Sequence, residues 1–214
     1  MTLVSIPSPG IPLEFGKRGE PLVIVVHDWY GRLPWLEEYG MKLSRQGFHV
    51  LVPDLFDGWA TTDDTEAERL LRRLDLTTSV NAIGTLARGG RAAGASRVGL
   101  VGFSMGGWLA LVQAKAGTAD AVVAYYATLG EPEHSVVPCP VQLHLAETDE
   151  WEEGGDPDSF IARLAEDGTT VERFDYLGTV HSFANGTMTS KYDRNAAALA
   201  FARAATFLER NLAD

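Results

Sequence analysis

A serine between glycines carries a strong chemical signal in this sequence. The run from Gly102 to Gly107, GFSMGG, follows a short apolar stretch and precedes a segment with helical periodicity. A tight turn from strand to helix needs glycine on both sides of such a serine, whose hydroxyl is then exposed above the sheet. There the free N–H groups at the start of the helix favour developing negative charge. The pattern predicts that Ser104 is a nucleophile, with an incidental serine in a glycine-rich turn as the alternative.

A serine hydroxyl is a weak nucleophile at neutral pH, so this prediction requires a general base. Around such a turn the chain order is serine, then acid, then histidine. His181 lies in the segment 177–183, which we expect to be a loop at the carboxyl end of the last strand. Active sites of open α/β sheets collect at that edge. We predict that His181 is the base, with a solvated loop histidine as the alternative.

The other histidines suit this role less well. His27 and His49 precede the serine, and His134 lies in a polar segment after a predicted strand. His144 falls inside an apolar strand, so a structural role within the sheet is favoured.

The acid that orients the imidazole must lie in a loop after a neighbouring strand. Asp149 comes three residues after the predicted strand that ends at Ala146, and we predict that it is this acid. Asp175 is disfavoured because it falls within the last predicted strand. Four other carboxylates share the acidic loop and are alternatives: Glu147, Glu150, Asp156 and Asp158.

The oxyanion that forms after nucleophilic attack needs two N–H donors. One is predicted to be the backbone N–H of Met105, the residue after the nucleophile. The other should come from the loop after an earlier strand, where we choose the backbone N–H of Trp29.

Apolar runs of strand length alternate with longer segments of helical period, which predicts parallel strands joined by crossover helices. We expect an α/β fold with a mostly parallel, doubly wound sheet flanked by helices, in a single domain over residues 1–214. Residues 1–20 contain three prolines, so we expect no regular structure there beyond an edge hairpin. Predicted strands cover residues 21–26, 48–53, 97–101, 121–126, 141–146 and 170–176. Predicted helices cover residues 33–46, 65–75, 77–93, 105–116, 157–167 and 191–212.

The formal net charge of −11 at pH 7 argues against nucleic acid and anionic membranes as partners. The sequence begins without the basic and apolar regions of a signal peptide, and its apolar runs are too short to span a membrane. We therefore expect a cytoplasmic protein that acts on a small molecule, and the oligomeric state stays open.

Cys139 is the single cysteine of the chain, which excludes an intramolecular disulfide and a cysteine-based metal cluster. It stands between two prolines at the entrance of a predicted strand, so we expect a buried filler rather than a reactive thiol. The residues imply no metal and no organic cofactor.

Three local patterns together resemble the dienelactone hydrolase family of the α/β-hydrolase superfamily. They are Asp28 to Gly31 with Gln46 to Phe56, then Val98 to Gly107, and finally His181 to Phe183 ahead of a terminal helix. The resemblance implies an α/β-hydrolase fold, hydrolysis of an ester or lactone bond, and a triad of Ser104, Asp149 and His181.

The sequence departs from the members of that family that open dienelactones. Those members have cysteine where this chain has Ser104, and a glutamate that manages the protonation of the thiol where it has Asp28. They also hold the substrate carboxylate with arginines, one of which corresponds to Asn185 here. The resemblance therefore leaves dienelactone itself as one candidate substrate.

Asp28 is a candidate contact to the substrate or the nucleophile, with capping of the loop before the 33–46 helix as the alternative. Arg32, Arg69 and Arg72 are candidate anion contacts, although solvated surface arginines are the favoured interpretation.

We predict a serine hydrolase that cleaves an ester or lactone bond of a small molecule through an acyl-enzyme. Within enzymes, the alternative is a carboxylesterase or thioesterase acting on neutral acyl groups, which Asn185 and the negative charge favour. Outside enzymes, the alternative is a non-catalytic ligand-binding member of the fold.

Overall fold

The computed structural model describes residues 3–130, 135–150 and 156–213. The strands are β1 Leu3–Ser5, β2 Leu13–Phe15, β3 Leu22–Val26, β4 His49–Val52, β5 Trp59–Thr61, β6 Val98–Phe103, β7 Ala121–Tyr125, β8 Val141–Thr148 and β9 Val171–Val180. The helices are α1 Trp35–Ser44, α2 Asp64–Arg73, α3 Leu76–Ala92, α4 Met105–Ala114, α5 Pro157–Glu166 and α6 Arg194–Leu212. Every predicted strand and helix is present, with shifts of a few residues at the ends.

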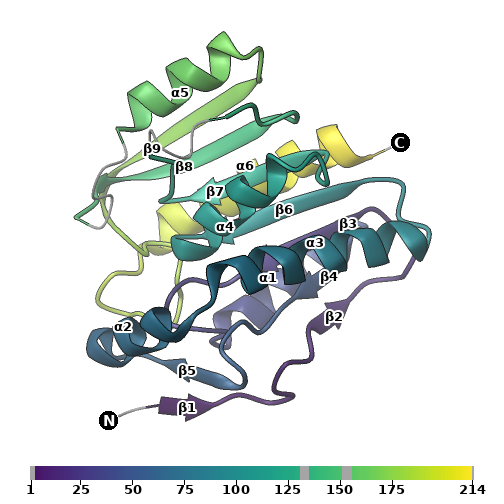
Figure 1. Cartoon of the computed structure of the whole chain (residues 1–214). Coiled ribbons are helices and arrows are strands. Elements are labelled where there is room, and N and C mark those ends of the chain that lie inside the picture. The colour runs from purple at the N-terminus through teal and green to yellow at the C-terminus, as the bar shows by residue number, and fades with distance from the viewer. Residues whose placement is uncertain (1–2, 131–134, 151–155, 214) are drawn as a thin grey trace.

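Seven strands form one sheet in the order β2-β4-β3-β6-β7-β8-β9 (Figure 1). β2 runs antiparallel to β4 at the edge, and the remaining neighbours run parallel. The chain passes from β3 to β4 on one side and later enters β6 on the other side of β3. This reversal confirms the predicted mostly parallel, doubly wound sheet. It also places the topological switch point of the sheet at the carboxyl ends of β3 and β6, where ligands bind in open α/β sheets.

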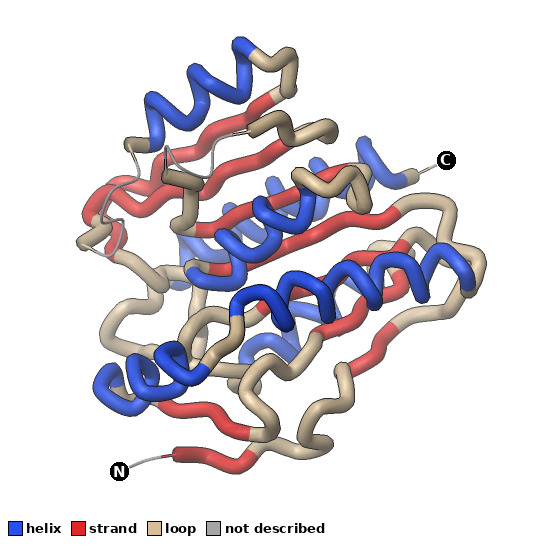
Figure 2. Tube along the Cα trace, viewed as in Figure 1, coloured by secondary structure: helices blue, strands red, loops and turns tan. Residues whose placement is uncertain are grey.

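Helices cover both faces of this sheet, with α3, α4 and α5 on one face and α1 and α6 on the other (Figures 1 and 2). All five residues of β3 are buried. Because side chains alternate along a strand, Val23 and Val25 join the core beneath α1 and α6, whereas Leu22, Ile24 and Val26 join the core beneath α3, α4 and α5. The uninterrupted apolar runs in the sequence are therefore explained by burial on both faces.

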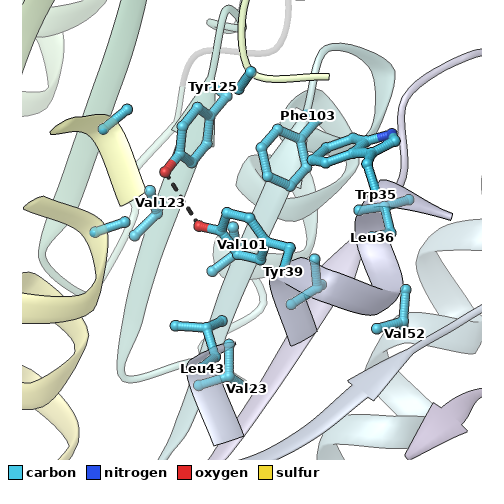
Figure 3. Close-up of a cluster of buried hydrophobic side chains, with 14 of the residues drawn as sticks. Val23, Trp35, Leu36, Tyr39, Leu43, Val52, Val101, Phe103, Val123 and Tyr125 are labelled. Atoms are coloured by element: carbon cyan, nitrogen blue, oxygen red, sulfur yellow. Dashed lines mark hydrogen bonds between the residues drawn. The ribbon is translucent and has the colours of Figure 1, made fainter. Parts of the chain in front are cut away.

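An aromatic cluster lies on the α1 and α6 side of the sheet (Figure 3). The hydroxyl groups of Tyr39 and Tyr125 form a hydrogen bond of 3.1 Å inside it. Burial raises the pKa of both hydroxyls, so both stay protonated at neutral pH. Phe103, the last residue of β6, meets the rings of Tyr39 and Trp35 edge to face at centroid distances of 5.2 and 4.7 Å. The end of the strand that leads into Ser104 is thus fixed by rigid packing.

The predicted end of the last strand was wrong. β9 continues to Val180 instead of ending at residue 176, so residues 177–180 are strand rather than loop. The reason is that β8 also extends to Thr148, which pairs with Val180 beyond an irregularity in the register after Ala146. The last helix begins at Arg194 rather than at residue 191, because the Asp193 side chain caps its first N–H groups.

The N-terminal segment does not form the edge hairpin that we allowed for. β2 pairs with β4, whereas β1 pairs antiparallel with β5 in a separate two-stranded ribbon. The surface location favoured for Arg32 was also wrong, since its side chain is buried and donates to the carbonyl oxygens of Pro7 and Ile11, each at 2.6 Å. A proline-rich segment outside the main sheet leaves carbonyl groups without ladder partners, and the guanidinium supplies the donors.

Arg69 and Arg72 lie on the exposed side of α2, where they pair with Glu66 and Glu68, in agreement with the surface interpretation. Cys139 is buried, as expected, and burial raises the pKa of its thiol to about 12. In the described part of the chain, no helix is long and apolar enough to cross a membrane. Within the same residues, no cluster of three or more His, Cys, Asp or Glu side chains is arranged to hold a metal ion.

Candidate active site

Ser104 stands at a strained turn between β6 and α4. Its φ of +53° lies in the left-handed region that residues other than glycine rarely adopt. A Cβ atom on Gly102 would lie 2.0 Å from the carbonyl oxygen of Gly106, so the turn closes only with glycine at position 102. The N–H of Ser104 donates to the carbonyl oxygen of Tyr125 at 2.9 Å, which ties the turn to β7. The turn, which we call the elbow, has the strained strand-to-helix geometry that the sequence predicts around Ser104.

Gly106 brings the first turn of α4 against the end of β3. A Cβ atom at this position would lie 2.4 Å from the carbonyl oxygen of His27 and 2.5 Å from that of Val26. Only a glycine permits this approach without displacing the backbone. The loop that follows β3 is therefore held directly beside the helix that begins at Ser104.

His181 follows β9 immediately, and its N–H donates to the carbonyl oxygen of Thr148 on β8 at 3.1 Å. Its Nε2 lies 2.7 Å from Oγ of Ser104. The ring is 4.9 Å from that of Tyr126, centroid to centroid. Because β9 continues to Val180, His181 lies directly beside Ser104. The ring of Tyr126 restricts the orientation of the imidazole.

Asp149 is the described carboxylate of the acidic loop that lies against His181. Its two carboxylate oxygens lie 2.7 and 2.8 Å from Nδ1 of the imidazole. A carboxylate accepts, so Nδ1 carries the proton and Nε2 is left to accept from the serine hydroxyl. The side chains of His181 and Asp149 are only 10% and 9% exposed, so this pair is largely shielded from water.

Three of the four alternative acids contact other groups. Glu147 accepts a hydrogen bond from the N–H of Gly178 at 2.6 Å. Asp156 caps α5, and Asp158 pairs with Arg173. The structure therefore brings the side chains of Ser104, His181 and Asp149 together, as the sequence predicts, with His181 between the serine and the aspartate.

Met105 and Trp29 lie at the same edge of the sheet. Met105 is the first residue of α4, and an N–H at that position has no acceptor within the helix. Val26, at the end of β3, is paired with Gly102 on β6, so the loop containing Trp29 emerges next to the elbow. This placement is compatible with the predicted pair of oxyanion donors.

Asp28 is completely buried and accepts hydrogen bonds on both carboxylate oxygens. The N–H of Tyr30 donates to Oδ1 at 3.0 Å, and Nδ2 of Asn185 donates to Oδ2 at 2.8 Å. Burial raises the pKa of the carboxyl group to about 6, opposed by these two hydrogen bonds and by the charges of His181 and Lys191. Asp28 closes the turn at Tyr30, whereas the first turn of α1 has no side-chain cap.

His144 is fully buried in β8, as the sequence favoured. Its Nδ1 accepts from the hydroxyl of Tyr176 at 2.7 Å, and its Nε2 donates to Oε1 of Gln142 at 2.8 Å. Burial lowers the pKa of this imidazole to about 3, so it is neutral at physiological pH. His144 therefore has a structural role.

A cluster of three residues that the sequence did not reveal braces the loop after β3. The hydroxyl of the buried Tyr30 donates to Oδ1 of Asp64 at 2.5 Å, and Nζ of Lys191 donates to the same hydroxyl at 2.6 Å. Lys191 belongs to the segment between His181 and α6. No spacing pattern could have indicated this contact, because Tyr30 and Lys191 are 161 positions apart.

The parallel sheet, the elbow and the histidine loop define an α/β-hydrolase fold. The model of the dienelactone hydrolase family matches residues 13–212. The chain belongs to this family, and it is a hydrolase of that class.

Known relatives and solved structures agree with this classification. A carboxymethylenebutenolidase from Pseudomonas putida is 29% identical over an alignment 216 residues long, and the alignment covers 90% of this chain and 86% of that protein. Protein usf from Aquifex pyrophilus is 26% identical over 190 residues, covering 83% of this chain and 82% of that protein. A dienelactone hydrolase-like promiscuous phosphotriesterase from metagenomic libraries superposes with a TM-score of 0.75 at 16% identity and covers 99% of each chain. This last likeness concerns the fold.

Proposed function

We propose that this protein is a serine hydrolase that cleaves an ester or lactone bond of a small molecule through an acyl-enzyme. The observation that carries the proposal is the continuous relay in which Ser104 Oγ lies 2.7 Å from Nε2 of His181, whose Nδ1 lies 2.7 Å from Asp149. A serine, a histidine and a buried acid in this arrangement are the groups that acyl transfer requires.

In the proposed mechanism, Oγ of Ser104 attacks the substrate carbonyl while Nε2 of His181 takes the hydroxyl proton. The new bond displaces the carbonyl π electrons onto oxygen, and the N–H groups of Met105 and Trp29 stabilise that oxyanion. The carbonyl then re-forms, and the leaving alkoxide takes the proton from His181. Water attacks the acyl-enzyme through the same two steps, which releases the acid and restores Ser104. Asp149 holds the imidazole in the accepting tautomer and stabilises its charged form.

One relative supports this class of reaction. The similar protein from Pseudomonas putida is named carboxymethylenebutenolidase, and a butenolide is a lactone. The identity of the nucleophile in this chain rests on its own geometry.

The Asn185–Asp28 contact favours a neutral acyl substrate over a carboxylate-bearing one. At the position where the family places an arginine, Asn185 is fully buried and its amide is engaged by Asp28. A neutral amide held in this way offers no positive charge to a substrate carboxylate. A carboxylesterase or thioesterase activity is therefore the second candidate.

The nucleophile is tested with Ser104→Ala and a small activated ester. We expect kcat/KM to fall by about three or more orders of magnitude, while the circular dichroism spectrum and melting temperature stay close to those of the wild type. A serine-directed phosphonate should add one covalent mass to the Ser104 peptide. The matched control is Ser44→Ala, because the hydroxyl of Ser44 donates to the Met41 carbonyl within α1. Retained activity in Ser104→Ala, or labelling of another peptide, would reject the assignment.

Substrate class is tested with a panel of lactones, neutral esters, thioesters and esters that carry a free carboxylate. We expect neutral substrates to have the higher kcat/KM at equal leaving-group pKa. Asn185→Arg introduces the positive charge that this chain lacks at position 185. If the wild type prefers the carboxylate-bearing members, the neutral-substrate candidate is wrong.

A further inference from the structure

His27 is a completely buried histidine that the proposed mechanism does not use. It lies between β3 and the loop that contains Trp29. Its Nδ1 lies 2.6 Å from the carbonyl oxygen of Asp28, and the N–H of Leu55 donates to its Nε2 at 3.1 Å. A carbonyl can only accept, so Nδ1 carries the proton and Nε2 is the acceptor. The two contacts agree on a single neutral tautomer.

The carbonyl that His27 holds belongs to the same peptide unit as the N–H of Trp29. In a planar trans peptide the C=O and N–H bonds point in opposite directions, so the direction of one fixes the direction of the other. The N–H of Gly31 donates to the same Asp28 oxygen at 3.1 Å. Two donors on one side of this peptide therefore determine where the Trp29 N–H points on the other side.

The backbone of His27 is also held against the helix that begins at Ser104. Gly106 approaches the His27 carbonyl so closely that a Cβ atom there would lie 2.4 Å from the oxygen. The ring of His27 contacts that of Phe56 in the β4–β5 connection at a centroid distance of 4.9 Å. The imidazole is thus packed against this connection and cannot rotate without breaking its hydrogen bonds to Asp28 and Leu55.

We propose that His27 is a positioning residue that aims the Trp29 N–H at the oxyanion, through its hydrogen bond to the Asp28 carbonyl. This inference rests on the proposed function, because it concerns the oxyanion formed during attack by Ser104. A rotated peptide would turn an N–H donor away from the developing charge, and the loss of one such donor costs about 10²–10³ in kcat. Burial lowers the pKa of His27 to about 4, which keeps the required neutral form throughout the neutral pH range.

The test compares His27→Asn with His27→Gln, two variants of similar polarity. Asparagine can place an amide N–H where Nδ1 donates, whereas the glutamine amide reaches toward the Nε2 position and leaves the Asp28 carbonyl without this donor.

The readout is the ratio of kcat/KM for an activated oxo ester to kcat/KM for its thiono analogue, in which sulfur replaces the carbonyl oxygen. Sulfur accepts hydrogen bonds poorly, so an aligned N–H donor speeds the oxo ester selectively. A residue needed only for folding would lower both rates and leave the ratio unchanged.

We expect His27→Gln and His27→Phe to lose at least tenfold in the oxo-to-thiono ratio, with kcat falling more than KM changes. His27→Asn should recover most of the ratio. His49→Gln is the matched control, because His49 is also buried but contacts Glu14 at the other end of β4, and its ratio should equal that of the wild type.

Equal ratios in His27→Asn and His27→Gln would overturn the inference, even if His27→Phe fails to fold. A wild-type ratio in His27→Gln would overturn it as well. The proposed function fails separately, if Ser104→Ala retains the activity of the wild type on the oxo ester or if the phosphonate labels another peptide.

Discussion

Asn185 donates a hydrogen bond of 2.8 Å to Asp28 across 157 positions of the sequence, and neither residue has exposed surface. The contact joins the loop that carries Trp29 to the segment that follows His181. Asn185 itself is oriented by the N–H of Thr187, which donates to its Oδ1 at 3.0 Å. The amide therefore cannot rotate freely, and the buried carboxylate depends on it for one of its two hydrogen bonds.

Asn185→Leu removes that donor at nearly constant volume. At pH 7.5 we expect the free energy of unfolding to fall by about 1–3 kcal/mol, because one oxygen of the buried Asp28 carboxylate is left without a partner. The loss should shrink at pH 5, since the carboxyl group, whose pKa is about 6 in the wild type, is then protonated and needs the donor less. Urea unfolding at the two pH values measures both effects. Asn195→Leu, at an exposed position of α6, is the control, and an equal loss at both pH values would contradict the explanation.

Asp149→Asn tests which carboxylate orients His181. We expect kcat for an activated ester to fall by about two to four orders of magnitude with little change in KM, because the amide no longer enforces the Nδ1–H tautomer or stabilises the imidazolium. Glu147→Gln, at the end of β8 and two residues before Asp149, is the matched control. Its amide oxygen can still accept from the N–H of Gly178, so activity should stay within about threefold of the wild type. Near-normal kcat in Asp149→Asn would reject Asp149 as the triad acid.

Gly106→Ala and Gly89→Ala form a pair with opposite expected signs. A Cβ atom at position 106 would collide with the backbone oxygens of Val26 and His27, so this variant should lose about 1–3 kcal/mol of stability and most of its activity. Gly89 lies on the exposed side of α3 with open space around it, and alanine there should stabilise the protein by up to about 1 kcal/mol. Thermal unfolding and ester hydrolysis measure the two effects. A neutral Gly106→Ala variant would mean that α4 can move away from β3 at no cost.

The main sheet and the three residues of the relay could be predicted because each depends on local information. Ser104 is identified by its glycines and by the strand and helix beside it. His181 and Asp149 follow from the rule that the carboxyl ends of parallel strands share one edge. Burial on both faces gives β3 and β6 uninterrupted apolar runs, which set them apart from surface segments.

The remaining features depend on contacts between distant segments, for which a single sequence carries little signal. Arginine side chains are usually exposed, so the residue type alone favoured a surface location for Arg32. Its burial depends on the path of residues 7–11, whose carbonyl groups accept its hydrogen bonds. The three-residue strands β1 and β2 are too short for a period-2 pattern to appear. Asp28 could be singled out in the sequence as a carboxylate near the elbow, but its partner Asn185 became apparent only in three dimensions.

His144 allows a test of how a buried neutral histidine makes stability depend on pH. In the unfolded chain an imidazole takes up a proton below about pH 6.5, whereas burial lowers the pKa of His144 in the folded state to about 3. Between these values the unfolded state binds more protons, so stability falls with falling pH by about 1.4 kcal/mol per pH unit for this group.

His144→Phe keeps the stacking on Tyr125 but removes the titration. It should be less stable than the wild type at pH 7.5, because the hydroxyl of Tyr176 loses its acceptor, and the difference should narrow steadily below pH 6.5. Tyr176→Phe is the control, since it loses the same hydrogen bond but keeps the imidazole and hence the pH slope. Urea unfolding followed by circular dichroism between pH 4.5 and 8 measures all three proteins, and parallel curves for the wild type and His144→Phe would show that His144 is not the group responsible.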